Sequence, residues 1–348
     1  MNSCKRVIAR LDVKGKKLIK GIRFEGLRVI GDACDYAKQY ANNGIDEIFY
    51  SDAVASLYGR NSLIEVLRET SKEVFVPITV GGAIRTVDDG RKLLSAGADK
   101  LALNTAVVRD PNLINKLSER FGKQCVVVSI QACKSFNKSG WDVMIESGRE
   151  RSSKDLFEWV KEVQERGAGE ILITSVDKDG TGLGHDNNLL EKVIDLINVP
   201  LVFGGGIGDI NHLRAMFINH KNLSGVSIGF SLHHKKLKIS NIKQELKKQN
   251  LPIRTFIASK HISFIKENVT VGIIDYGMGN LQSLKNAFEI LGKKSELINN
   301  IDDLQYKSSS NLLILPGVGA FPEGMKQLYR LELIDKIKNY SKKGGCLI

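Results

Sequence analysis

The sequence predicts an α/β fold, a closed (βα)8 barrel, and three observations support this prediction. Eight short apolar runs alternate with amphipathic stretches along the first two thirds of the chain. Most of these runs are apolar throughout, as expected for parallel strands buried on both faces. The pattern then repeats itself after about 120 residues, which is typical of an internal duplication. An open doubly wound sheet is the structural alternative.

The expected strands follow one another at regular intervals. They span residues 6–13, 45–52, 75–82, 99–105, 124–132, 169–176, 199–206 and 225–230. Between them, stretches such as 87–98 and 153–168 carry acidic residues early and basic residues late, which favours helices because of the helix dipole. In a barrel of this kind the reactive groups lie where strands end and βα loops begin.

The two halves of the expected barrel resemble each other. VPITVGG (76–82) and VPLVFGGG (199–206) share the order of Val-Pro, strand and glycine loop. Any two βα units look somewhat alike, but this matching order favours a half-barrel duplication. Glycine lets backbone N–H groups approach a phosphate, so duplicate glycine loops predict two phosphate sites facing each other across the barrel mouth. The expected ligand therefore carries a phosphate at each end.

Two polar residues stand at duplicate strand ends. Asp12 is a candidate general acid or base, with a helix cap or loop carboxylate as the alternative. Gln131 holds the equivalent place in the second half. An amide can hydrogen-bond a substrate but cannot transfer a proton near neutral pH, so Gln131 is either an impaired catalytic position or a residue that only binds.

Charged residues also stand where four strands begin, at the opposite end of the barrel. They are Arg6, Glu47, Lys100 and Glu170. Two acids and two bases at one rim predict a ring of ion pairs. Periodicity alone favours the simpler alternative of four solvent-exposed charges.

Composition argues against several classes of protein. The net charge is +12, but the 51 basic residues are scattered and form no stripe interleaved with aromatics, which disfavours nucleic acid binding. Neither a signal peptide nor an apolar run of roughly 20 residues is found, so we expect a cytoplasmic protein that does not contact membranes. Five cysteines without metal-type spacing favour a reduced compartment. We expect no metal and no cofactor.

Several motifs together resemble one family, the cyclase subunit of imidazole glycerol phosphate synthase. They include RVIARLDVKGKKLIKG, VPITVGGAIRTVDD, GADKLALNTAVVRDPNLI and GAGEILITSVDKDGT, and the resemblance covers residues 1–254. It implies a lyase of histidine biosynthesis on a (βα)8 barrel. Such an enzyme combines ammonia with a bis-phosphorylated ribulosyl-formimino nucleotide. It receives the ammonia through the barrel from a glutaminase subunit docked at the N-terminal face.

The resemblance also implies roles for individual residues. Asp12 matches one catalytic aspartate and Lys20 the lysine of the mobile first loop, and Arg6, Glu47, Lys100 and Glu170 match an ammonia gate. The remaining matches, all to substrate- or phosphate-binding positions, are Gly82, Asn104, Thr105, Asp177, Asp179, Gly180, Gly205, Gly206 and Gly229.

Two positions depart from the family pattern. Gln131 stands where the family has its second catalytic aspartate, and Phe230 replaces a small phosphate-binding serine. Both changes would impair cyclisation more than ammonia transfer. The alternative function is therefore an ammonia-channelling homologue with weak or no cyclase activity that supplies a sugar amidotransferase in surface-polysaccharide biosynthesis. A phosphosugar isomerase on the same barrel is a third reading.

The end of the chain resembles the glutaminase partner. We expect a linker at 255–269 and a partial class I amidotransferase-like domain at 270–348, on the basis of VGIIDYGMGNLQSLKNAFEILG and LLILPGVGAFPEGM. In that family a nucleophile elbow of G-x-C-x-G type follows a run like GGCLI. Cys346 is not in such a motif, so we expect no glutamine hydrolysis by this chain. A gene fusion, a read-through product and a fragment all fit this order.

Overall fold

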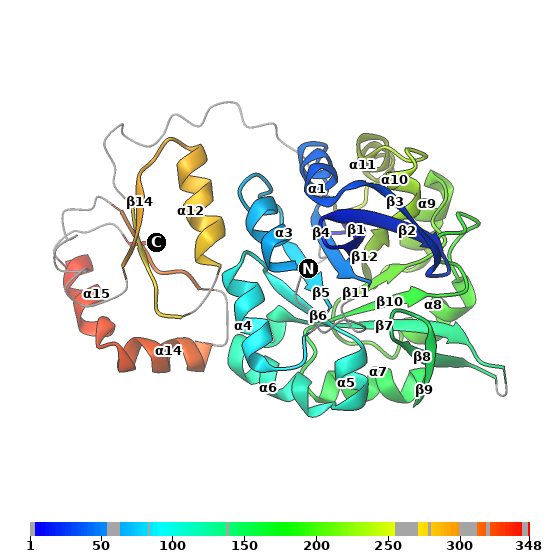
Figure 1. Ribbon diagram of the computed structural model, residues 1–348, viewed down its shortest axis with the longest axis horizontal. Coiled ribbons are helices and arrows are strands. Elements are labelled where there is room, and N and C mark those ends of the chain that lie inside the picture. The colour runs from blue at the N-terminus through cyan, green and yellow to red at the C-terminus, as the bar shows by residue number, and fades with distance from the viewer. Residues whose placement is uncertain are drawn as a thin grey trace.

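The computed structural model describes residues 4–53, 63–82, 84–136, 139–254, 271–277, 280–298, 312–317, 321–342 and 347–348. Its first part is a closed barrel of parallel strands surrounded by helices (Figure 1). β7 pairs with β10, and β1 pairs with both β4 and β12, so the sheet closes on itself and the open-sheet alternative is wrong. The barrel strands are β1 (Arg6–Lys14), β4 (Glu47–Asp52), β5 (Ile78–Gly81), β6 (Lys100–Leu103), β7 (Val126–Lys134), β10 (Glu170–Ser175), β11 (Leu201–Gly204) and β12 (Leu223–Ile228).

The barrel core has two parts because successive side chains of a strand point to opposite faces. On β1, Val7, Ala9 and Leu11 are fully buried beneath the helices, whereas Ile8 points into the barrel. The inner apolar layer that fills the barrel consists of Ile8, Phe49, Ala102, Val127, Leu172 and Val202. β1 therefore carries its functional residues on the inward face, at alternate positions.

The helices start at clear N-terminal caps. Thr86 and Asp89 form a capping box at α4, and Asp32 caps α1 by accepting from two backbone N–H groups. The helices around the barrel are α1 (Ala33–Asn42), α3 (Leu63–Thr70), α4 (Val87–Ser95), α5 (Thr105–Arg109), α6 (Asn112–Phe121), α7 (Leu156–Glu165), α8 (Asn187–Ile194), α9 (Ile210–Asn219), α10 (Phe230–His233) and α11 (Ile239–Lys248).

Two antiparallel hairpins extend the barrel at its C-terminal end. One is formed by β2 (Lys17–Ile22) and β3 (Glu25–Asp32) after β1, the other by β8 (Trp141–Ile145) and β9 (Glu150–Asp155) after β7. The helix expected at 153–168 therefore starts too early. Its first residues belong to β9, and α7 begins at Leu156 because the Asp155 side chain accepts from the N–H groups of the first turn.

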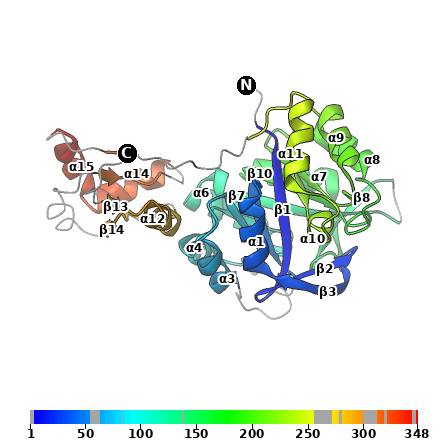
Figure 2. The same cartoon turned by 90° about the horizontal axis from the view of Figure 1, so that it is seen from above.

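A second, smaller unit packs against the barrel beside α3, α4 and α6 (Figure 2). Asn286 Nδ2 donates to the Ser71 carbonyl at 2.5 Å, and Arg120 pairs with Glu323. Among its described residues, three parallel strands lie in the order β14-β13-β15. The glutaminase resemblance of this unit stays a prediction. The expected linker and Cys346 lie outside the described residues. The elements are β13 (Val271–Ile274), α12 (Leu281–Ile290), β14 (Ser295–Ile298), β15 (Leu312–Ile314), α14 (Phe321–Arg330) and α15 (Leu333–Lys342).

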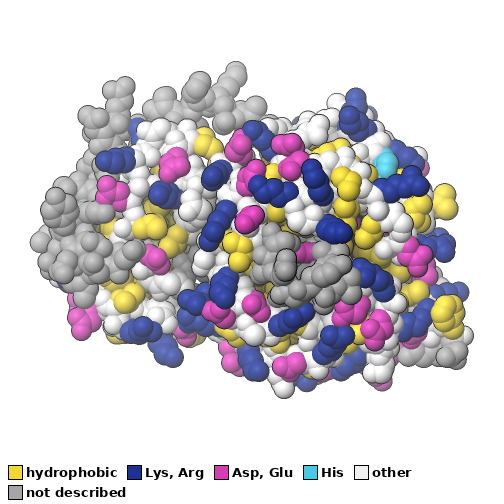
Figure 3. Space-filling view, in the orientation of Figure 1, with side chains coloured by type: hydrophobic (Ala, Val, Ile, Leu, Met, Phe, Trp, Pro, Cys, Tyr) yellow, Lys and Arg dark blue, Asp and Glu magenta, His cyan; other side chains and the backbone are white. Residues whose placement is uncertain are grey.

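The surface carries mixed charges. On the face in Figure 3, lysine and arginine side chains lie among aspartate and glutamate side chains. Within the described ranges, no helix is both long and apolar enough to cross a membrane. The same residues contain no group of three or more His, Cys, Asp or Glu side chains arranged to hold a metal ion.

Candidate active site

A buried cluster of four charges occupies the barrel mouth. Asp12 lies near the C-terminal end of β1, and each of its carboxylate oxygens meets a cation. Arg10 Nε donates to Oδ1 at 2.9 Å and Lys20 Nζ donates to Oδ2 at 2.9 Å. Lys20 also contacts Asp179 Oδ2 at 2.7 Å, so the lysine joins β1, the β2–β3 hairpin and the loop after β10.

The cluster holds Asp12 in its ionised form. Burial alone would raise the pKa of Asp12, but attraction by Arg10 and Lys20 and their hydrogen bonds lower this pKa well below its usual range. Burial would likewise lower the pKa of Arg10, yet Asp12 and Asp179 raise it. At neutral pH Asp12 is therefore a carboxylate that can accept a proton or stabilise positive charge, and it has no proton to donate.

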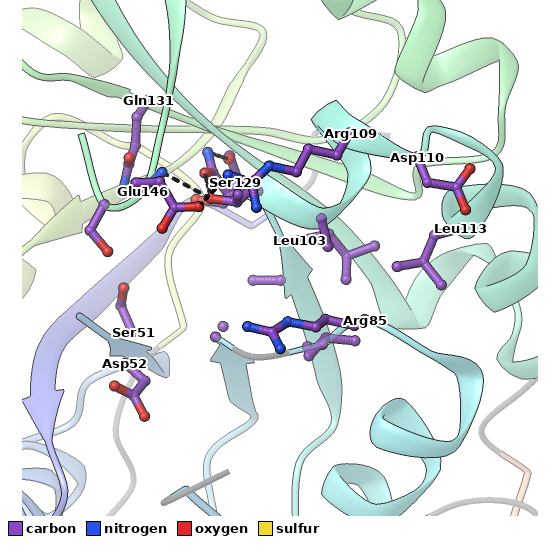
Figure 4. Close-up of a pocket in the computed structure, with 18 of the residues that line it drawn as sticks. Ser51, Asp52, Arg85, Leu103, Arg109, Asp110, Leu113, Ser129, Gln131 and Glu146 are labelled. Carbon is purple, nitrogen blue, oxygen red and sulfur yellow. Dashed lines mark hydrogen bonds and ion pairs between the residues drawn. The ribbon is translucent and has the colours of Figure 1, made fainter. Parts of the chain in front are cut away.

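The first glycine loop lines a cavity of about 300 Å³ beside this cluster. Gly82, Asn104 and Thr105 all line it, together with Gly81. The Asn104 side chain also donates to the Ser129 carbonyl at 2.8 Å, which ties β6 to β7. In Figure 4, Ser51 and Gln131 lie on one side of the cavity and Arg85 on the other. Backbone N–H groups and an arginine make this cavity suited to a phosphate.

The second glycine loop lines a much smaller cavity, of about 10 Å³. Gly206 has φ +86°, and a methyl group there would lie 2.0 Å from the Gly184 carbonyl oxygen, so only glycine fits. The Phe230 ring borders this cavity and lies 4.3 Å from the His234 ring. The expected site residues that line it are Asp179, Gly180, Gly205, Gly206 and Gly229.

Gln131 reaches the first cavity from β7. Its side chain is 5% exposed, and its Oε1 has no hydrogen-bond partner among the described residues. A buried acceptor without a partner is unfavourable, so this oxygen is available to an N–H group of a ligand.

Asp177 is not part of the charged cluster. Its Oδ2 accepts from the Lys134 backbone N–H at 2.8 Å and its Oδ1 from the Cys133 thiol at 3.3 Å. The carboxylate therefore fastens the end of β7 to the loop after β10, and of the two expected aspartates in this loop only Asp179 meets Asp12 through Lys20.

The four charges at the other end of the barrel form a ring of ion pairs. Arg6 lies 2.9 Å from both Glu47 and Glu170, and Lys100 lies 3.0 and 3.2 Å from the same two carboxylates. Glu47 also accepts from the Thr79 hydroxyl at 2.5 Å. The alternative of four solvent-exposed charges is wrong, since both glutamates are buried. Above the ring, a cavity of about 10 Å³ lies among Ile8, Phe49 and other inward side chains.

Sequence reasoning missed several residues of the mouth. Arg10 stands inside an apolar run and gave no motif signal. Its inward direction follows only from its position two residues before Asp12 on the same strand. Other polar lining residues that it missed include Arg85, Arg109, Glu146, Ser147, Thr174 and Ser227.

Comparison with known proteins places this arrangement in a family. The family model described as "Histidine biosynthesis protein" matches residues 6–238. The chain is 49% identical over 209 residues to the imidazole glycerol phosphate synthase subunit HisF of Legionella pneumophila, a match that covers 60% of this chain and 98% of the relative. It is 41% identical over 250 residues to HisF of Wolinella succinogenes, with 72% and 98% covered. The chain therefore belongs to the histidine biosynthesis protein family, and its barrel is of the type of the HisF cyclase subunits.

Proposed function

We propose that the barrel is a cyclase-type lyase of histidine biosynthesis that uses ammonia and a bis-phosphorylated nucleotide. The observation that carries this proposal is the position of Asp12, an ionised carboxylate buried at the mouth beside two glycine-lined cavities. The relatives of this chain are named as imidazole glycerol phosphate synthase subunits, and these names support the same reaction.

In this proposal the two glycine loops hold the two phosphates and place the reacting atoms near Asp12. The loop at Gly82 serves the wider cavity and the loop at Gly205 and Gly206 the narrower one. Ammonia adds, the imidazole ring closes, and the aminoimidazole carboxamide ribotide leaves as the second product. Asp12 accepts the proton released in these steps, and Lys20 orients its carboxylate. The second cavity is small in this structure, so a phosphate there requires the surrounding loops to move apart.

Ammonia would enter at the opposite face. Glu47 and Glu170 of the ring line the small cavity in the barrel interior, and the ring that they form with Arg6 and Lys100 would act as its gate. We propose that a glutaminase subunit docks on this face and releases ammonia to the ring. The apolar side chains above the ring favour neutral ammonia over ammonium, because a charge is strongly disfavoured in an apolar interior.

The test is turnover by the full chain of the ribulosyl-formimino nucleotide with ammonium salts as the nitrogen source. We expect imidazole glycerol phosphate to form and Asp12→Asn to lower the rate by roughly 10²–10⁴. Asp88→Asn, the same chemical change at an exposed position on α4, is the matched control and should retain the activity. Equal rates for the parent chain and Asp12→Asn would refute Asp12 as the base.

A second function is favoured by Gln131. Because an amide cannot transfer a proton, the barrel would pass ammonia onward to a sugar amidotransferase and cyclise little or nothing. No product from the parent chain, in a preparation that binds the nucleotide, would support this ammonia conduit over the cyclase.

A further inference from the structure

Arg10 is a charged residue of the mouth to which the proposed mechanism assigns no role. Its side chain is 4% exposed and lies inside the barrel, between the apolar layer and Asp12. The guanidinium lies over two aromatic rings, with its central carbon 5.1 Å from the centre of the Phe24 ring and 5.6 Å from that of Phe49. Stacking of this kind restrains a planar cation in one orientation.

The contacts of Arg10 link Asp12 to Thr174, which lies beside position 131. Its Nε donates to Asp12 and its Nη1 to the Thr174 hydroxyl at 3.0 Å. Thr174 is in turn the register partner of Gln131 in the pairing of β10 with β7. A guanidinium in this place therefore faces Asp12 directly and the side chain at position 131 across one threonine.

Arg10 differs from Lys20 in how it is anchored. Lys20 belongs to the β2–β3 hairpin, whereas Arg10 stands on β1 itself, two residues before Asp12 and on the same face. β1 is paired with β12 on one side and with β4 on the other. The Arg10–Asp12 pair is thus fixed by the barrel, whatever the position of the hairpin.

We propose that Arg10 is a positioning residue that makes Asp12 a weak proton acceptor in the proposed cyclisation. Replacing Gln131 by aspartate therefore cannot by itself restore proton transfer at both positions. Asp12 can accept a proton only on an oxygen that already accepts a hydrogen bond from Arg10 or Lys20. An aspartate at 131 would stand beside Thr174, to which the same guanidinium donates a hydrogen bond. This inference rests on the proposed cyclase function.

Two cations lower the pKa of Asp12, Arg10 from β1 and Lys20 from β2. The other titratable groups near it are Asp179 after β10, which pairs with Lys20, and His233 from α10, which is neutral. Arg10→Met removes one of the two cations and keeps most of the side-chain volume, while Lys20 still pairs with the carboxylate. The substitution is therefore a test of charge that leaves Asp12 with a partner.

The first measurement is the nucleotide turnover of Gln131→Asp, Arg10→Met and the double variant, across pH. We expect Gln131→Asp alone to gain less than about tenfold over the parent chain and the double variant to exceed it by at least about tenfold. The acid limb of the pH profile should move to higher pH whenever Arg10 is replaced. Arg214→Met, on the surface helix α9, is the matched control and should change neither quantity.

The second measurement is independent of turnover. The carbon-13 carboxyl signal of Asp12, assigned with Asp12→Asn, is followed against pH in the full chain. We expect its titration to lie at least about one pH unit higher in Arg10→Met than in the parent. Arg10→Lys keeps the positive charge but not the planar guanidinium, and the titration of Asp12 in this variant should fall between those of the parent and Arg10→Met. If Arg10→Met does not fold, Arg10→Lys is compared with the parent instead.

The outcomes separate the two proposals. Gln131→Asp as fast as the double variant, or an unchanged titration of Asp12 after both substitutions of Arg10, would overturn the role of Arg10. If no variant forms product while the titration of Asp12 still moves, the proposed cyclase function fails and the control of Asp12 by Arg10 stands.

Discussion

The Tyr40 hydroxyl lies 2.8 Å from His233 Nδ1, and the opposite ring nitrogen of His233 lies 2.9 Å from the Arg10 carbonyl oxygen. A neutral imidazole satisfies both contacts, with Tyr40 donating to Nδ1 and Nε2–H donating to the carbonyl. The histidine thereby fastens α1 and α10 to the strand that carries Asp12. Burial, with the nearby Lys20, lowers the pKa of His233 to about 4.

The free energy of unfolding should therefore depend on pH through His233. The unfolded chain binds a proton below about pH 6.5, and the folded chain does so only below about 4, so stability falls as pH drops through this window by roughly 3 kcal/mol. His233→Gln should flatten that part of the curve in urea unfolding. His234→Gln, at the exposed neighbouring position, is the control, and parallel curves for the parent and His233→Gln would contradict the prediction.

Lys20→Met should lower kcat/KM for the nucleotide by about 10², because it removes a donor that orients Asp12 and joins it to Asp179. The same change should make the β2–β3 hairpin easier to cleave in limited proteolysis with chymotrypsin, which cuts after Phe24. Lys17→Met, exposed on the same strand, should leave both unchanged. Similar kcat/KM values for the two variants would show that Lys20 does not position the carboxylate.

Glu47→Gln should lower the free energy of unfolding by about 1–3 kcal/mol. The reason is that Arg6 and Lys100 would then share the single carboxylate of Glu170. Asp88→Asn removes the partner of two surface side chains on α4 and should produce no measurable change. Tryptophan fluorescence during urea unfolding reports on the barrel, and equal effects of the two substitutions would argue against a stabilising ring.

Gly206→Ala should lower the free energy of unfolding by about 3 kcal/mol and weaken phosphate binding at least about tenfold. The added methyl group meets the Gly184 carbonyl in a loop that also has positive φ. Gly292 also has positive φ, but a methyl group added there would contact nothing. Gly292→Ala therefore measures the backbone strain without a steric clash. Calorimetry with inorganic phosphate measures the affinity of each variant for phosphate. Undiminished affinity in Gly206→Ala would exclude this loop as a phosphate site.

The barrel could be predicted because each of its strands is buried on both faces, so that an apolar run marks it. The two hairpins could not be predicted, because β3 exposes most of its side chains and β9 buries none of its residues, so neither strand carries an apolar period. Arg10 was missed for the opposite reason. A single charge within an apolar run gives no indication of the two aromatic rings near its side chain, or of Thr174 on a strand more than 160 residues later.

The distant pairing of β1 with β12 has a consequence for how the chain folds. Arg6 aligns with Gly225, so nearly the whole barrel sequence must be in place before this seam can form. Contacts of such long sequence separation form slowly, because closing the intervening loop is entropically unfavourable. Asp12 lies on β1 and Asp179 in the loop after β10, and closure of the barrel at this seam is needed to bring the two together. Recovery of turnover during refolding should therefore report the final closing step rather than the collapse of the core.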